Sequence, residues 1–103
     1  MYNEMNTFWS LIQETEKGNC VWTQTLTDTG DVQYTCTRKK KKRTWTFIFQ
    51  EFKKEEITYW RLTCLSPYPE KVKLWAIDMG EHFPGLFNYG KILMSLILNR
   101  CAA

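Results

Sequence analysis

The chain of 103 residues has few of the residues from which catalytic and metal sites are usually built. It contains one histidine, and its four cysteines, at positions 20, 36, 64 and 101, show no C-x-x-C spacing, so a zinc site is not expected. The five glycines are scattered and form no phosphate-binding loop. The sequence therefore predicts no metal, no cofactor and no catalytic residues, and it favours reduced, mostly buried thiols.

Long hydrophobic runs are also missing. The longest, 92–98, covers seven positions and includes Ser95, whereas a membrane span needs about 18 or more apolar residues. The first 18 residues lack the basic and apolar regions of a secretory signal, and the chain has no N-x-Ser/Thr site. We therefore expect no membrane association and a cytoplasmic or nuclear location rather than secretion.

The composition indicates a packed domain with one unusual segment. Hydrophobic residues make up 44% of the chain, aromatic residues 16%, and five residues are tryptophan, which is ample for the core of one domain spanning 1–103. The net charge is +3. Since Arg38–Arg43 contribute +6 to this total, the remaining residues sum to −3. Any affinity for anions must therefore come from this segment rather than from a general positive field.

Hydrophobic periodicity predicts the order of elements. Apolar residues recur at helical spacing over 3–17 and 86–100, and they alternate at period two over four strands. Trp9 belongs to the apolar stripe of the first helix, which we expect to end at Gly18 and Asn19. The stripe of the second helix is expected at Leu86, Tyr89, Leu93, Leu96, Ile97 and Arg100. The segment 71–79 favours a fifth strand with Val72, Leu74 and Ala76 on one face, with a helical turn as the alternative. The predicted fold is α+β: an antiparallel, four- to five-stranded meander sheet with N-terminal and C-terminal helices packed on one face. The four strands span 21–27, 32–38, 43–52 and 57–65.

Four-residue loops at 39–42 and 53–56 would give a consistent register. Cys36 would then lie opposite Trp45, and Phe47 opposite Leu62, so that one face of the sheet is apolar throughout. This arrangement would place Cys36 and Cys64 on either side of the central strand, about 10 Å apart, which is too far for a disulfide.

The basic segment is the main candidate site. Because it contains no Gly, Asn or Pro, we expect an open, mobile loop at the tip of a hairpin. Three interpretations remain open: contact with nucleic acid or another polyanion through phosphates, a solvated tip that protects a sheet edge, and a nuclear-import signal. The candidate binding residues are Arg38, Lys39, Lys40, Lys41, Lys42 and Arg43, and Lys53, Lys54 and Arg61 are candidates to extend the patch.

The aromatic strand that follows the basic segment, "RTWTFIF", differs from the aromatic strand of RNA-recognition modules. Thr44 and Thr46 occupy its small positions, and Gln50 replaces its last aromatic. Trp45 and its aromatic neighbours also fall on the face assigned to the core, which argues against base stacking on this sheet. The order of elements is similar to that of small ββββα folds that bind single-stranded nucleic acid and dimerise through a terminal helix, an analogy of fold alone.

Two further surfaces are candidates for protein contacts. Ile48, Tyr59 and Arg61 project from the outer face of the predicted sheet, and Tyr and Arg are favoured in interfaces. The helix at 86–100 is apolar almost all round, which is typical of a buried helix or of one shared in a homodimer. Asp78, Glu81 and His82 form the one cluster of titratable residues that includes the histidine. We interpret this cluster as a loop that makes local hydrogen bonds rather than as a site of acid–base chemistry.

The sequence thus predicts a small non-enzymatic binding or regulatory module that contacts nucleic acid or another polyanion through 38–43. The alternative is a protein-interaction or inhibitor protein, of a kind also carried by viruses and mobile elements. Such a protein would bind a protein partner through the outer sheet face or the C-terminal helix.

Overall fold

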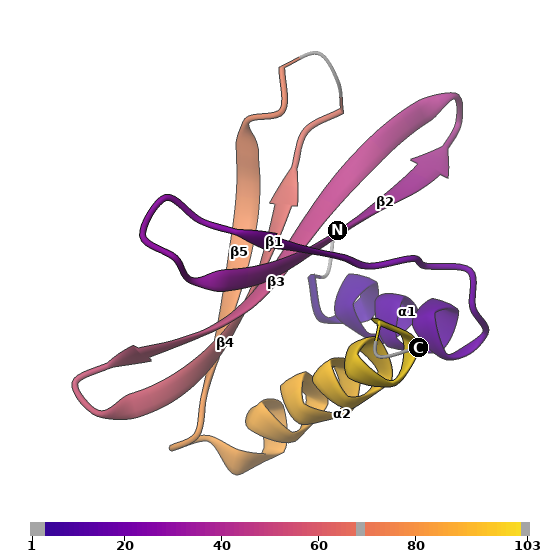
Figure 1. Ribbon diagram of the computed structural model, residues 1–103. Coiled ribbons are helices and arrows are strands. Elements are labelled where there is room, and N and C mark those ends of the chain that lie inside the picture. Colours follow the sequence, from indigo (N-terminus) through magenta and orange to yellow (C-terminus); the bar gives the residue numbers. More distant parts are fainter. Residues whose placement is uncertain (1–3, 68–69, 102–103) are drawn as a thin grey trace.

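A computed structural model describes residues 4–67 and 70–101 of the chain (Figure 1). Five strands form one sheet in the order β1-β2-β3-β4-β5, and every neighbouring pair is antiparallel. The sheet is therefore a meander, in which each strand lies beside the one that precedes it in the chain. The elements are α1 (Glu4–Glu16), β1 (Thr23–Leu26), β2 (Val32–Lys40), β3 (Arg43–Lys54), β4 (Ile57–Leu65), β5 (Lys73–Gly80) and α2 (Pro84–Cys101).

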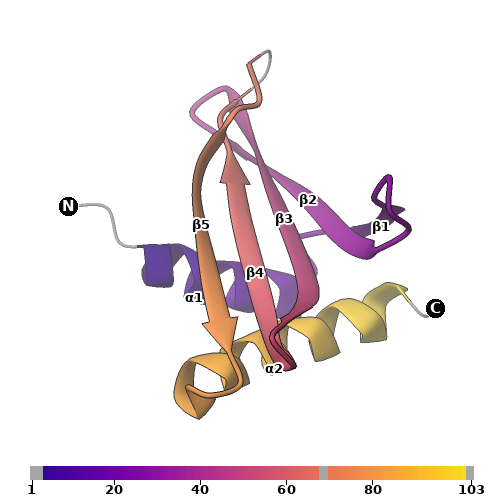
Figure 2. The same ribbon diagram turned by 90° about the vertical axis from the view of Figure 1, so that its left-hand side faces the viewer.

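Both helices lie on the same face of the sheet, as Figure 2 shows. The predicted α+β fold is confirmed, and the segment left open between strand and helix is the strand β5. Neither helix in the described part of the chain is both long and apolar enough to cross a membrane.

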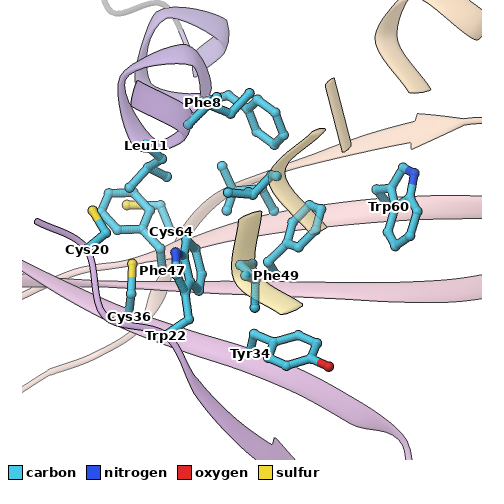
Figure 3. Close-up of a cluster of buried hydrophobic side chains, with 14 of the residues drawn as sticks. Phe8, Leu11, Cys20, Trp22, Tyr34, Cys36, Phe47, Phe49, Trp60 and Cys64 are labelled. Carbon is cyan, nitrogen blue, oxygen red and sulfur yellow. The ribbon is translucent and has the colours of Figure 1, made fainter. Parts of the chain in front are cut away.

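The core is built between the sheet and the helices and is rich in aromatic side chains (Figure 3). The ring of Phe49 on β3 lies at its centre: it contacts Phe8 of α1 at 6.1 Å between centroids and stacks on Trp60 of β4 at 5.6 Å. The indole of Trp22 donates a buried hydrogen bond to Thr15 Oγ1 at 2.9 Å, which explains why a threonine is tolerated in the core. The core therefore ties α1 to β3, to β4 and to the segment that leads into β1.

The end of α1 follows the sequence prediction. Gly18 has a φ of 86°, a left-handed conformation that glycine adopts without a Cβ penalty, and the backbone N–H of Asn19 donates to the carbonyl of Glu14 at 2.8 Å. This is the glycine-terminated helix end expected from the sequence. Trp9 departs from the predicted apolar stripe, because 48% of it is exposed.

The two central hairpins have tighter turns than expected. The predicted four-residue loops are wrong: Lys40 pairs with Arg43, and Lys54 pairs with Ile57, so each turn has only two residues. The turn residues have φ values of 51° and 65° in the first turn and 53° and 66° in the second. Positive φ at both positions is typical of the type I′ turn, whose twist matches that of the flanking strands.

The shorter turns shift the cross-strand pairs by two residues. Cys36 lies opposite Phe47, and Phe47 lies opposite Cys64. Because side chains alternate with a period of two, the predicted apolar face is still the buried one. Cys20, Cys36 and Cys64 are buried free thiols, as expected, and the side chain of Cys101 lies outside the described residues.

The three residues that the sequence placed on one face of the segment 71–79 are not its core-facing residues. Val72, Leu74 and Ala76 are exposed, and the residues that face the core are Trp75, Ile77 and Met79, opposite three buried residues of β4. Both sets are apolar, so alternation alone did not distinguish them. The register also shifts between Cys64 and Leu65, which leaves Leu74 as an extra residue in β5, the arrangement of a β-bulge.

The buried side of α2 is also rotated from the predicted stripe. Leu93 and Ile97 are buried, as expected, but Leu86 and Tyr89 are exposed, and the side chain of Arg100 lies outside the described residues. The helix approaches the sheet closely at Gly90, because a Cβ at this position would overlap the indole of Trp60. Glycine is therefore required there for packing rather than for a special φ.

We expect Gly90→Ala to lower the free energy of unfolding by about 1–3 kcal/mol, the usual effect of overpacking a core. At Gly85, in the first turn of the same helix, an added Cβ would meet no neighbouring atom within 4 Å. Gly85→Ala is therefore the matched control, and it should be neutral or stabilising by up to ~1 kcal/mol. Urea unfolding of both variants tests this, and equal effects would contradict the close approach of α2.

Candidate functional site

The far end of the β2–β3 hairpin extends beyond both helices (Figure 2). The core-side face of the sheet is therefore covered near α1 and α2 but not near the Lys41–Lys42 turn. Trp45, which the sequence placed in the covered core, is only partly buried. An aromatic side chain on the inner face is thus left at the boundary of the core.

A cleft of about 940 Å³ lies at this boundary. The first turns of α1 form one wall, and the β2–β3 hairpin forms the opposite wall. The floor comes from the inner face of β3, β4 and β5. The residues that line the cleft are Asn6, Thr7, Ser10, Arg38, Lys39, Lys41, Arg43, Trp45, Phe47, Cys64, Leu74 and Trp75.

Four of the six predicted basic residues line this cleft: Arg38 and Lys39 from β2, Lys41 from the turn, and Arg43 from β3. Lys42 is exposed in the turn and does not line the cleft. The structure describes the backbone of Lys40, which lies in β2, but its side chain lies outside the described residues. The basic segment is therefore the paired end of a hairpin and not the open loop that the sequence predicted.

The floor of the cleft is aromatic because a small residue separates two large ones. Phe47, Cys64 and Trp75 form one cross-strand row. The centroids of the Phe47 and Trp75 rings lie 6.4 Å apart. The bulge in β5 explains how the consecutive residues Leu74 and Trp75 both reach the cleft, since a bulge interrupts the strict alternation of faces.

Burial raises the pKa of the Cys64 thiol to about 11. This residue is therefore a neutral thiol at neutral pH, and the floor carries no negative charge that would oppose an anion.

Arg38 has a second role beneath α1. Its Nη1 donates to Ser10 Oγ at 3.3 Å, which holds the guanidinium between the hairpin and the helix. The Cys20 and Cys36 side chains lie next to each other (Figure 3), and the positive charge of Arg38 affects the pKa values of both thiols. The hydrogen bond from Cys36, and to a lesser extent Arg38, lower the pKa of Cys20 to about 7, whereas burial opposes this shift.

The same thiol pair has the opposite effect on Cys36. The pKa of Cys36 is raised, first by the hydrogen bond to Cys20 and then by burial. Cys20 is therefore the thiol of the pair that loses its proton first. Sequence reasoning considered only the Cys36–Cys64 pair and missed this contact, because Cys20 lies outside the regular strand pairing.

The residues predicted for a protein interface lie on the outer face, away from the cleft. Arg61 is not available to extend the basic patch, because its Nε and Nη2 donate to the two carboxylate oxygens of Asp78 at 2.6 and 2.9 Å. The guanidinium carbon of Arg61 also lies 4.4 Å from the ring centroid of Phe52. The Phe52 ring in turn stacks on the Tyr59 ring, with their centroids 5.1 Å apart. Ile48 is partly buried on the same face.

The remaining candidate residues from the sequence analysis do not line the cleft. Lys53 and Lys54 lie at the opposite end of β3 from the cleft, so the basic patch is not continuous. Asp78 is paired with Arg61, which lowers the pKa of its carboxyl, and Glu81 Oε1 accepts a hydrogen bond from the backbone of Thr58 at 3.1 Å. His82 packs against Tyr59 and Phe83. Within 4–67 and 70–101, no three His, Cys, Asp or Glu side chains are grouped as metal ligands would be.

Comparisons with known protein families, curated protein sequences and solved structures gave no match to this chain.

The left-handed turn residues lead to a prediction about stability. Lysine and glutamate at positive φ are strained by about 1 kcal/mol or more each, whereas asparagine and glycine favour this conformation. We expect Lys41→Asn/Lys42→Gly and Glu55→Asn/Glu56→Gly each to raise the free energy of unfolding by roughly 1–2 kcal/mol. Urea unfolding measures both, and a loss of stability in either variant would contradict the type I′ turns.

The thiol pair leads to a prediction about pH. Between pH 7 and pH 9, folded Cys20 has lost its proton while the unfolded chain, with an ordinary pKa of 9.0, still binds it. The contribution of Cys20 to the free energy of unfolding therefore rises with pH across this range. Relative to Cys20→Ser, the wild type should gain stability between urea titrations at pH 7 and pH 9. The same response to pH in both proteins would contradict the lowered pKa.

Proposed function

We propose that this protein is a small non-enzymatic binding module that contacts nucleic acid, or another polyanion, through the cationic end of the β2–β3 hairpin. The observation that carries the proposal is the convergence of Arg38, Lys39, Lys41 and Arg43 on one cleft, in a chain whose charge outside 38–43 is −3. The positive charge is therefore local, and it surrounds a concave surface.

The cations at this cleft lack carboxylate partners among the described salt bridges, since the one ion pair there joins Arg61 to Asp78 on the outer face. A phosphate group is a suitable partner for these cations, because Arg and Lys bind it through charge-assisted hydrogen bonds. Release of counterions from a polyphosphate backbone adds to the affinity and makes it sensitive to salt. Such contacts position a strand but carry little sequence information.

Backbone strain at the turn is consistent with a role for its side chains. Lys41 and Lys42 occupy positions where Asn and Gly would be more stable. The Glu55–Glu56 turn has the same strain at the opposite end of β3, so strain by itself does not identify the site. The proposal rests on the charge and the cleft, and the second turn provides a control.

The alternative is a protein-interaction or inhibitor protein that uses the outer face. The observation in its favour is a row of packed aromatic rings that connects Phe52, Tyr59, His82 and Phe83, and 59% of Phe83 is exposed. Substitutions then discriminate between the two functions. If the partner is a protein, Tyr59→Ala and Ile48→Ser should weaken its binding, and substitution of the hairpin lysines should not.

A homodimer through 86–100 is compatible with either function. Leu86, Tyr89, Ile92 and Leu98 of α2 are exposed, and Trp9 of α1 packs edge-on against Tyr89 at 5.8 Å. A second copy that packed against these residues would cover exposed apolar side chains. A monomer mass that does not change with concentration in light scattering would exclude this dimer.

We expect Lys39→Gln/Lys41→Asn/Lys42→Gly to abolish oligonucleotide binding at physiological salt and to flatten the dependence of affinity on salt. Each lost phosphate contact on a single strand should reduce the slope of log K against log salt by about 0.7. Fluorescence anisotropy with labelled single- and double-stranded oligonucleotides measures both quantities. The substituted turn favours the type I′ conformation, so the loss cannot be attributed to unfolding.

The matched control is Lys17→Gln/Lys53→Gln/Lys54→Gln, which removes three exposed lysines away from the cleft. It should retain most of the affinity. Equal affinity of the hairpin variant and the wild type would refute the proposal, and so would equal losses in the two triple variants. Binding of heparin without binding of any oligonucleotide would restrict the function to other polyanions.

A further inference from the structure

We propose that the cleft between α1 and the β2–β3 hairpin receives an unpaired nucleobase, so that the ligand is a single-stranded nucleic acid. This inference rests on the proposed function and specifies its substrate class. It follows from the combination of an aromatic floor and a cationic wall in one cavity, which neither the basic segment nor the aromatic strand indicated separately.

The aromatic floor is the first argument. Trp45, Phe47 and Trp75 line the same cleft as the four cations, and Cys64 between them is a neutral thiol. A polyanion without rings would interact with the cations and leave this apolar surface uncovered. A nucleobase would cover it, because every base has a face that stacks on aromatic side chains.

The size of the cleft is the second argument. Its volume of about 940 Å³ falls within the range of roughly 300–1,000 Å³ that is typical of small-molecule sites. A nucleotide is within the size that such sites accept, and its base would lie on the floor with its phosphate at the wall that carries Arg38, Lys41 and Arg43. The cations come from both strands of the hairpin and from its turn, so they can follow a backbone that passes over the cleft.

The concave shape distinguishes a single strand from a duplex. In a duplex the bases are stacked on each other and present only their edges in the grooves. A single strand can turn a base out of its stack and place it on an aromatic side chain. A duplex would reach the exposed cations of the hairpin but not the tryptophans at the floor.

The test compares three fluorescein-labelled probes of equal length: an oligothymidylate single strand, the same strand with abasic sites in place of the thymidines, and a duplex. The abasic strand retains the phosphates and lacks the bases. We expect the wild type to bind the oligothymidylate roughly 5- to 150-fold more tightly than the abasic strand, the effect of stacking one base. The duplex should bind through its phosphates alone, so its affinity should not depend on the tryptophans of the floor.

Trp45→Leu should remove this preference. Its affinity for the oligothymidylate should fall toward that of the abasic strand, whereas its binding of the abasic strand and the slope of affinity against salt should not change, because the phosphate contacts remain. The matched control is Trp9→Leu, which removes a tryptophan that is 48% exposed on α1 and does not line the cleft. It should retain the preference.

Each outcome has a separate meaning. Binding of all three probes with equal affinity, lost in the hairpin variant, would overturn the base-binding cleft and leave the proposed function intact. Failure of the wild type to bind any probe at low salt would overturn both. A preference for the oligothymidylate that is as large in Trp45→Leu as in the wild type would overturn the assigned floor. If Trp45→Leu does not fold, the affinities of the wild-type protein for the three probes still show whether a base is bound.

Discussion

A slip of one residue in the pairing of β2 with β3 would turn Phe47 and Phe49 away from the core, so the fold depends on the register of its central hairpins. Two-residue turns at both ends of β3 fix that register. The same constraint creates the candidate site, because it continues the ladder to Lys40 and Arg43 and places Arg38 opposite Trp45 on the inner face. Core and cleft are therefore consequences of one pairing pattern.

The sequence was sufficient for the features that follow from alternation. It predicted the order of the elements, the antiparallel meander and the buried face of β3, because Phe47 and Phe49 alternate with threonine, isoleucine and glutamine. It could not predict the turn length, since Lys-Lys and Glu-Glu carry none of the usual type I′ signals. For β5 both faces are apolar, and the choice of Trp75 over Leu74 for the core side is made by pairing with β4 and by the bulge.

The cationic half of the candidate site was visible in the sequence as a run of like charge, but the aromatic half was not. Trp45 alternates in phase with the core residues of β3, and only the extent of the helical cover leaves it partly exposed. That extent is set by how α1 lies across the sheet, a property of packing between distant segments. A tryptophan near the end of a long strand, beside a charged turn, is the one local signal that could have indicated this position.

The row of Phe47, Cys64 and Trp75 belongs to the floor of the cleft and also continues directly into the core. A molecule held there would rest on the same side chains that stabilise the folded state. Its binding free energy would therefore appear as cooperative stabilisation of the whole sheet, which grows with the logarithm of ligand concentration, rather than as the ordering of a peripheral loop. Thermal denaturation of this protein would then respond to occupancy of the cleft without any reporter attached to it.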